Sequence, residues 1–176
     1  YGDVIVYKKP NQNIIHRAML YLELKDGSTS NVIWHIPSLK DYSHWAMSAT
    51  GAFEPDEDLK AACWNNDTCE LTITDADSGC FFWLTDVGYG NVNVSIDLYR
   101  LGHNQLEGYS GYLTKGDNAS TNTRFDQTSG IYDNRLVQYE IIKSVAMVEI
   151  PWIGSIKLMA NGNGSNVPSN SITDLI

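Results

Sequence analysis

Segment 90–100 constrains the fold of this chain more than any other stretch. Apolar residues occupy every second position, namely Val92, Val94, Ile96 and Leu98. Polar or amphipathic residues fill the positions between them, namely Asn93, Ser95, Asp97 and Tyr99. Because successive side chains of an extended chain point to opposite faces, one face covers a core and the other faces water or a partner. Glycines at both ends favour changes of direction. We therefore predict a β-strand around which other strands pack.

Further segments alternate in the same way or form short apolar runs between turn residues. They are 3–7, 17–24, 31–36, 69–74, 80–85, 106–114, 136–142 continuing into 146–150, 155–159 and 171–176. Segment 38–48 is ambiguous, because Ser38 is also a suitable cap for a short helix. Pro55 followed by three acidic residues predicts a helical turn. We predict an all-β fold with two antiparallel sheets packed as a sandwich or jelly roll, and one or two short helices.

Length and charge limit the classes of function. The 176 residues suit a single domain over 1–176. The formal net charge is -9, and the longest basic run is Lys8-Lys9. Nonspecific nucleic-acid binding needs clustered cations, so we expect no strong nucleic-acid binding by this domain. No apolar run reaches the roughly 20 residues that a membrane helix needs, so we expect no membrane span.

The three cysteines, Cys63, Cys69 and Cys80, do not make a paired framework, because an odd number leaves one thiol over. Their spacing matches no zinc site. The favoured interpretation is buried thiols in a reducing compartment, and the alternative is a Cys63–Cys69 disulfide in a secreted protein. Secretion would also make acceptors of the Asn-x-Ser/Thr triplets that begin at Asn66, Asn93, Asn118 and Asn163.

Residues that could carry chemistry are sparse. Asp75 and Asp77 precede Gly79 as in the start of a calcium loop, but the remaining oxygen ligands are missing, so a plain turn is favoured. Ser110 lies between glycines without the strand-turn-helix context of a nucleophile elbow. The four histidines share no metal-ligand spacing. We expect neither an enzyme nor a cofactor.

Two segments resemble a known family. Residues 90–99 read Gly-Asn-Val-Asn-Val-Ser-Ile-Asp-Leu-Tyr, follow the aromatic run 81–84, and lead to Gly108-Tyr109. Residues 139–142 read Tyr-Glu-Ile-Ile, and 146–154 read Ala-Met-Val-Glu-Ile-Pro-Trp-Ile-Gly. In this order they resemble strands of the jelly-roll capsid proteins of picorna-like viruses. The match covers 81–159, and the final strand or two of an eight-stranded roll are missing or supplied from elsewhere.

The resemblance implies a structural coat protein that assembles with copies of itself or with sister coat proteins into an icosahedral virion in the host cytoplasm. It implies an inter-subunit contact at Glu149, Ile150, Pro151, Trp152 and Ile153. It also implies that the polar segment 115–133 is an exposed surface loop for a host receptor. The loop residues singled out are Lys115, Asp117, Asn118, Arg124 and Asp126.

A secreted carbohydrate-binding sandwich is the alternative. The residues available for stacking on sugar rings are Trp34, Trp45, Trp64, Trp83 and Trp152. In that protein Asp75 and Asp77 would hold calcium. Specific sugar binding by a monomer favours the lectin, whereas sedimentation as a large particle favours the coat protein.

Overall fold

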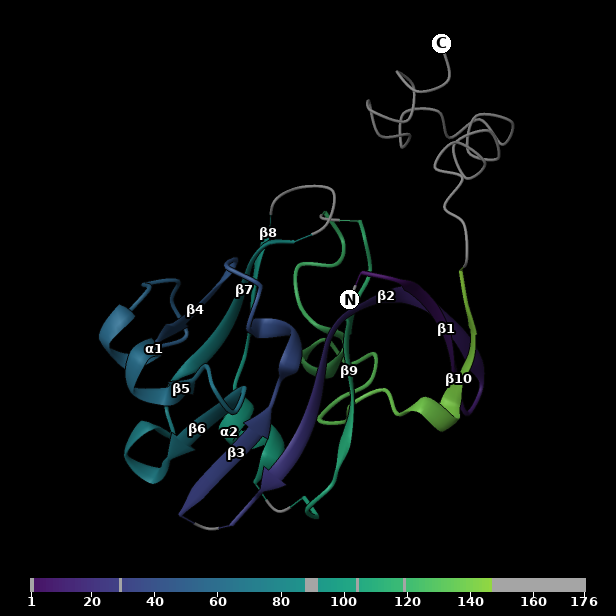
Figure 1. Cartoon of the computed structure of the whole chain (residues 1–176). Coiled ribbons are helices and arrows are strands. Elements are labelled where there is room, and N and C mark those ends of the chain that lie inside the picture. The colour runs from purple at the N-terminus through teal and green to yellow at the C-terminus, as the bar shows by residue number, and fades with distance from the viewer. Residues whose placement is uncertain (1, 29, 88–91, 104, 119, 147–176) are drawn as a thin grey trace. The chain divides into compact units, whose positions relative to one another are not determined.

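The computed structural model describes residues 2–28, 30–87, 92–103, 105–118 and 120–146 (Figure 1). Residues up to Val145 form one compact unit. Its strands form two antiparallel sheets, of seven and three strands, with short helices in the connections. This confirms the predicted all-β class and the two-sheet arrangement. No helix among the described residues is long and apolar enough to cross a membrane.

The larger sheet has the order β10 (Ile142–Val145), β1 (Val4–Lys9), β2 (Gln12–Asp26), β3 (Asn31–His35), β6 (Glu70–Thr74) and β5 (Trp64–Asn65), and β9 (Ser110–Lys115) also pairs with β2. The smaller sheet has the order β4 (Trp45–Ser48), β7 (Phe81–Val87) and β8 (Val92–Ile96). The helices are α1 (Glu57–Cys63) and α2 (Leu98–Gly102), and the 3-10 turns are η1 (Pro37–Leu39), η2 (Asp75–Asp77), η3 (Asp126–Thr128) and η4 (Tyr139–Ile141).

Strand β2, the long curved ribbon in Figure 1, pairs with three strands, β1, β3 and β9. Arg17 pairs with β1 and with β9, and Glu23 pairs with β3 and with β9. Because a strand residue has one neighbour on each side, β1 and β3 follow one another along one edge of β2 and β9 occupies the other edge. The β2–β9 register shifts between Ala18 and Leu20, where three consecutive residues are buried. An irregularity of this kind breaks the simple alternation of faces.

The main core contains buried apolar residues from both sheets and from α2. A second, smaller apolar cluster consists of Ile5, Tyr7, Ala18 and Val137. Trp34 of β3 is fully buried, and its indole N–H donates to the carbonyl oxygen of Leu98 at 3.0 Å. This bond ties the larger sheet to α2 and satisfies a polar group that would be costly to bury alone. Trp45 is also buried in this core, so two of the proposed stacking tryptophans serve it, whereas Trp83 is 8% exposed and lies outside this cluster.

Segment 90–100 is only partly a strand. Its structure is described from Val92, and β8 ends at Ile96, at one edge of the smaller sheet. The carboxylate of Asp97 accepts a hydrogen bond from the backbone N–H of Arg100 at 2.8 Å, which caps α2. Leu98 and Leu101 are buried at helical spacing. The expected continuation of the strand through Tyr99 is therefore wrong, because local capping favours a helix.

The other helix and strand predictions had mixed outcomes. Helix α1 begins after Asp56, whose side chain accepts from the N–H of Leu59 at 2.9 Å, as the acidic run after Pro55 predicted. Segment 38–48 holds no α-helix capped by Ser38, and its last four residues form strand β4. The predicted strand 136–142 is instead an isolated bridge at Val137, the turn η4 and the start of β10. The predicted strands 155–159 and 171–176 lie outside the described residues.

Gly102 provides a test of the packing between α2 and β3. A Cβ atom at Gly102 would lie 2.5 Å from a methyl carbon of Val32 and 3.0 Å from the Trp34 ring. We expect Gly102→Ala to lower the free energy of unfolding by about 1–3 kcal/mol, as overpacked cores do. A Cβ at Gly79 would meet nothing within 4 Å, so Gly79→Ala is the matched control. Equal urea midpoints for the two variants would contradict this account.

Candidate functional site

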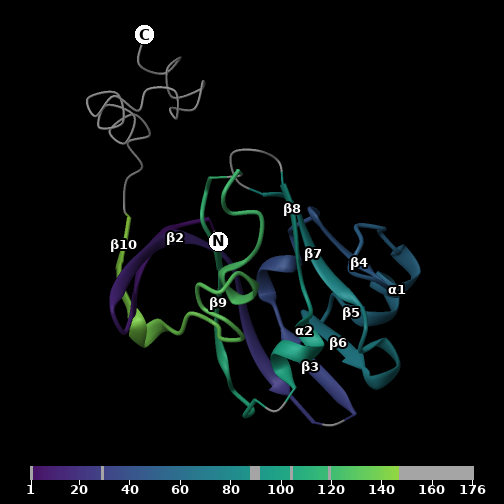
Figure 2. The same cartoon turned by 180° about the vertical axis from the view of Figure 1, so that it is seen from behind.

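A cavity of about 600 Å³ lies between β7, β8, α2 and the segment that follows β9. Figure 2 shows this green segment beside β9, on the side of β8 and α2. Its lining residues are Gly51, Phe81, Trp83, Asn93, Ser95, Ile96, Asp97, Arg100, Leu101, Thr123, Arg124, Gln127, Thr128, Asp133 and Asn134. Segments far apart in the sequence therefore supply its walls.

The polar face of β8 forms one wall. Asn93, Ser95 and Asp97 line the cavity, whereas Val94 is buried in the main core. The alternation seen in the sequence predicted that this face meets water or a partner, and the cavity is where it does so. Phe81 and Trp83 of the adjacent strand β7 add aromatic surface.

The cavity contains charges of both signs. Asp97 caps α2, and Asp133 accepts from the backbone N–H of Gly130 at 2.7 Å. Arg100 and Arg124 are exposed, and within the described parts of the chain neither guanidinium makes an ion pair. Each carboxylate is thus held by the backbone, while each guanidinium remains available to a ligand.

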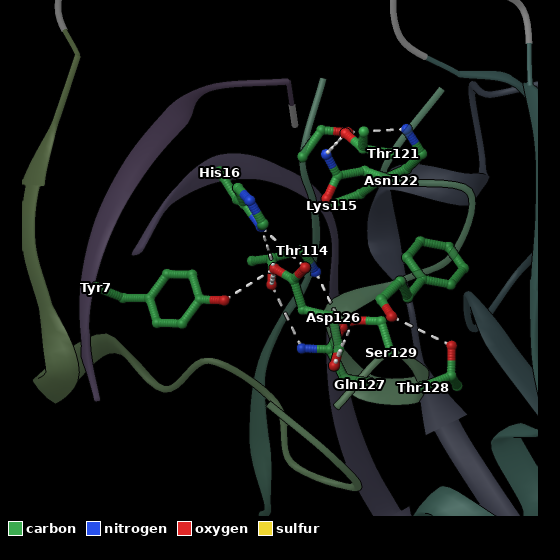
Figure 3. A network of polar contacts seen from close by, with 12 residues as sticks. Tyr7, His16, Thr114, Lys115, Thr121, Asn122, Asp126, Gln127, Thr128 and Ser129 are labelled. Atoms are coloured by element: carbon green, nitrogen blue, oxygen red, sulfur yellow. Dashed lines mark hydrogen bonds and ion pairs between the residues drawn. The ribbon is translucent and has the colours of Figure 1, made fainter. Parts of the chain in front are cut away.

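A buried polar cluster lies next to the turn that forms the opposite wall (Figure 3). Asp126 of η3 is fully buried, and its carboxylate accepts from the Tyr7 hydroxyl at 2.8 Å and the Thr114 hydroxyl at 2.6 Å. Nδ1 of His16 lies 2.7 Å from the same carboxylate. Strands β1, β2 and β9 thus each supply one partner to the Asp126 cluster, which consists of Tyr7, His16, Thr114 and Asp126.

Burial shifts the pKa values of two side chains in this region, Tyr7 and Lys115. It is the main cause that raises the pKa of the Tyr7 hydroxyl, and the negative charge of Asp126 raises that pKa further. Tyr7 therefore remains a hydrogen-bond donor in the folded protein. Lys115 is also buried, which lowers the pKa of its ammonium group, and Nζ donates to the carbonyl oxygen of Gly116 at 2.9 Å. A buried carboxylate is tolerated here because several donors surround it.

Gln127 connects the Asp126 cluster to the cavity. Its side-chain oxygen accepts from the backbone N–H of Thr114 at 3.1 Å, and the residue also lines the cavity. The turn η3 is therefore fastened to β9 by two successive side chains. These hydrogen bonds also hold the neighbouring segment that carries the cavity residue Arg124.

The predicted exposed loop is correct only in part. Asn118 and Arg124 are exposed, and Asp117 is partly exposed and binds the Arg17 guanidinium through both oxygens, at 2.9 and 2.8 Å. Lys115 and Asp126 are buried, so their assignment to an exposed surface is wrong. Two of the residues that bind Asp126, Tyr7 and His16, are more than a hundred positions away from it in the sequence. Local sequence patterns therefore carried no signal of these contacts.

The Asp126–His16 pair resembles the orienting half of a catalytic triad, which sequence reasoning missed. Among the described residues, no hydroxyl or thiol is hydrogen-bonded to Nε2 of His16. The contact is therefore explained by stability: His16 is one of the hydrogen-bond partners that the buried Asp126 carboxylate needs.

The proposed calcium ligands already have partners. Asp75 accepts from the Tyr99 hydroxyl, and Asp77 accepts from the Thr74 hydroxyl at 2.7 Å. The described part of the chain contains no group of three or more His, Cys, Asp or Glu side chains able to hold a metal ion. The predicted contact residues 149–153 lie outside the described residues.

The Asp126 cluster can be tested by removing its charge. Asp126→Asn places an amide among the donors that now face a carboxylate, so we expect the free energy of unfolding to fall by about 2–4 kcal/mol. Asp41→Asn, at an exposed carboxylate, should change it by less than about 0.5 kcal/mol. Urea denaturation followed by tryptophan fluorescence measures both values. A loss no larger than that of the control would refute the stabilising role of Asp126.

The cysteines generate a second prediction. All three are free, and burial raises the pKa of Cys63 to about 11 and that of Cys80 to about 12. Only the partly exposed Cys69 should react quickly with iodoacetamide at pH 8, because the thiolate is the reactive form. Mass spectrometry should show one rapid adduct on the native protein and three in denaturant. Rapid native labelling at Cys63 or Cys80 would contradict the buried arrangement.

Comparison of this chain with protein-family models, with curated proteins and with solved structures found no match.

Proposed function

We propose that this chain is a structural coat protein of a picorna-like virus. The observation that carries the proposal is the ordered pair of segments, 90–99 and 139–154, which resembles strands of that capsid family. Two antiparallel sheets with short connecting helices are compatible with it. A jelly-roll topology is part of the proposal, with the last strands supplied by residues beyond Val145 or by a neighbouring subunit.

The described surface supports a role in assembly. Strands β10, β1 and β2 form one end of the larger sheet, and Ile15 on β2 is 66% exposed opposite Val6. Val145 on the edge strand β10 and Tyr139 in η4 are also exposed. Among the described residues β10 ends the sheet on this side, and an edge strand beside exposed apolar side chains favours contact with another chain.

Assembly of this kind requires no reaction and no cofactor. The partners are other coat-protein copies or sister coat proteins, and a host receptor that meets the surface of the particle. The place of action is the virion, assembled in the host cytoplasm. The formal charge of -9 disfavours RNA packaging by this domain itself.

The assembly proposal predicts a defect at the family-like contact 149–153. The double variant Trp152→Ala and Ile153→Ser removes large apolar side chains from this segment, so it should abolish or reduce particles at least tenfold relative to the parent chain. Sedimentation and negative-stain electron microscopy, with the sister coat proteins co-expressed, measure this. Leu106→Ser alters a residue that is 85% exposed in a different connection and is the control. Normal particles from the double variant would count against the contact, and a strictly monomeric parent chain would count against the coat function.

A carbohydrate-binding sandwich is the second candidate, and the cavity favours it. The wall of β8 offers amide, hydroxyl and carboxylate groups beside the aromatic residues of β7, which is a composition suited to sugars. A monomer that binds a defined sugar, and that forms no particle with any coat protein, would support this candidate over the first.

A further inference from the structure

We propose that the cavity between β8, α2 and segment 123–134 binds an acidic saccharide, that is, a sugar that carries a carboxylate or a sulfate group. The binding itself depends only on the geometry of the cavity. Its interpretation as receptor recognition at a virion surface rests on the proposed coat function.

The size of the cavity restricts its occupant. Its volume of about 600 Å³ lies within the roughly 300–1,000 Å³ that small-molecule sites occupy. A single substituted sugar ring or a disaccharide fits this volume. The walls come from strands β7 and β8, from helix α2 and from the segment held by Asp126 and Gln127, so the cavity is formed before a ligand arrives.

The charges of the cavity require a ligand of mixed character. Arg100 and Arg124 approach from α2 and from the segment after β9, and an acid group pairs well with a guanidinium. Asp97 and Asp133 each use one oxygen on a backbone N–H, which leaves the other oxygen to accept from a ligand hydroxyl. An acidic sugar supplies both the acid group and the hydroxyls.

Two simpler ligands fit less well. A bare anion would meet the two arginines but would also face the two carboxylates, and it has no hydroxyl donors for them. A neutral sugar would offer the two guanidinium groups only uncharged hydroxyl acceptors, which bind a guanidinium more weakly than a carboxylate or sulfate does. A ligand that carries both an acid group and hydroxyl groups therefore matches the polar groups of the cavity better than either simpler ligand.

The aromatic side of the cavity supports a ring-shaped ligand. Phe81 is partly exposed there, and Trp83 beside it is held by a hydrogen bond from its indole N–H to the Ser48 hydroxyl at 2.9 Å. Aromatic surfaces of this type pack against the C–H face of a sugar ring. Asn93 and Ser95 lie on the adjacent strand, where they offer hydrogen bonds to the ring substituents.

The test is titration of the full chain with four probes, followed by ligand-observed NMR and calorimetry. The probes are the methyl glycoside of N-acetylneuraminic acid, galactose 6-sulfate, galactose and sodium sulfate. We expect one or both acidic sugars to bind, with neutral galactose and sulfate at least tenfold weaker. The first two probes also decide whether the acid group is a carboxylate or a sulfate. Equal binding of galactose, sulfate binding alone, or no binding of either acidic sugar would overturn the proposal.

Variants locate the site. Arg100→Gln and Arg124→Gln should each weaken the acidic sugar at least tenfold without changing the melting temperature, because both side chains are exposed. Arg135→Gln is the matched control, since Arg135 is an exposed arginine that directly follows this segment and lies outside the cavity lining. Loss of binding in the control alone, or unchanged binding in both cavity variants, would refute this location. Particle formation by the cavity variants reports on the coat function separately.

Discussion

The backbone hydrogen bonds along β2 are the interaction on which the rest of this structure depends. One strand carries β1 and β3 in succession along one edge and β9 along the other, so β1 and β9, about a hundred residues apart in the sequence, meet there. The shift of register near Met19 turns three consecutive side chains inward. A change at this strand would therefore affect both the main core and the smaller cluster around Tyr7.

The buried carboxylate of Asp126 extends this arrangement to a segment without regular secondary structure. A loop held only by solvent-exposed contacts would sample many conformations. Here the desolvation cost of one charge is offset by donors from three strands, and the loop gains a defined position. The same turn then carries Gln127 into the cavity wall. Stability and the shape of a potential binding surface therefore depend on the same few side chains.

The two proposed roles use different parts of the molecule. Assembly would involve the end of the larger sheet around Ile15 and β10, whereas ligand binding would involve the cavity against β8. Because no residue named in one role is needed in the other, the two can coexist in a coat protein that also recognises a receptor. The chain as a whole is acidic, so the two guanidinium groups of Arg100 and Arg124 make the cavity locally more positive than the rest of the molecule.

The sequence by itself determined the all-β class, the turn at Pro55 with its acidic cap, and the polar face of β8, since alternation and capping are local patterns. Only the tertiary structure decided that Asp97 ends β8 by capping a helix, that β2 rather than β8 is the central strand, and that Lys115 and Asp126 are buried. The physical reason is distance along the chain: Tyr7 and Asp126 are 119 residues apart, and a polar residue in a loop shows no sign of burial until its remote partners are brought to it.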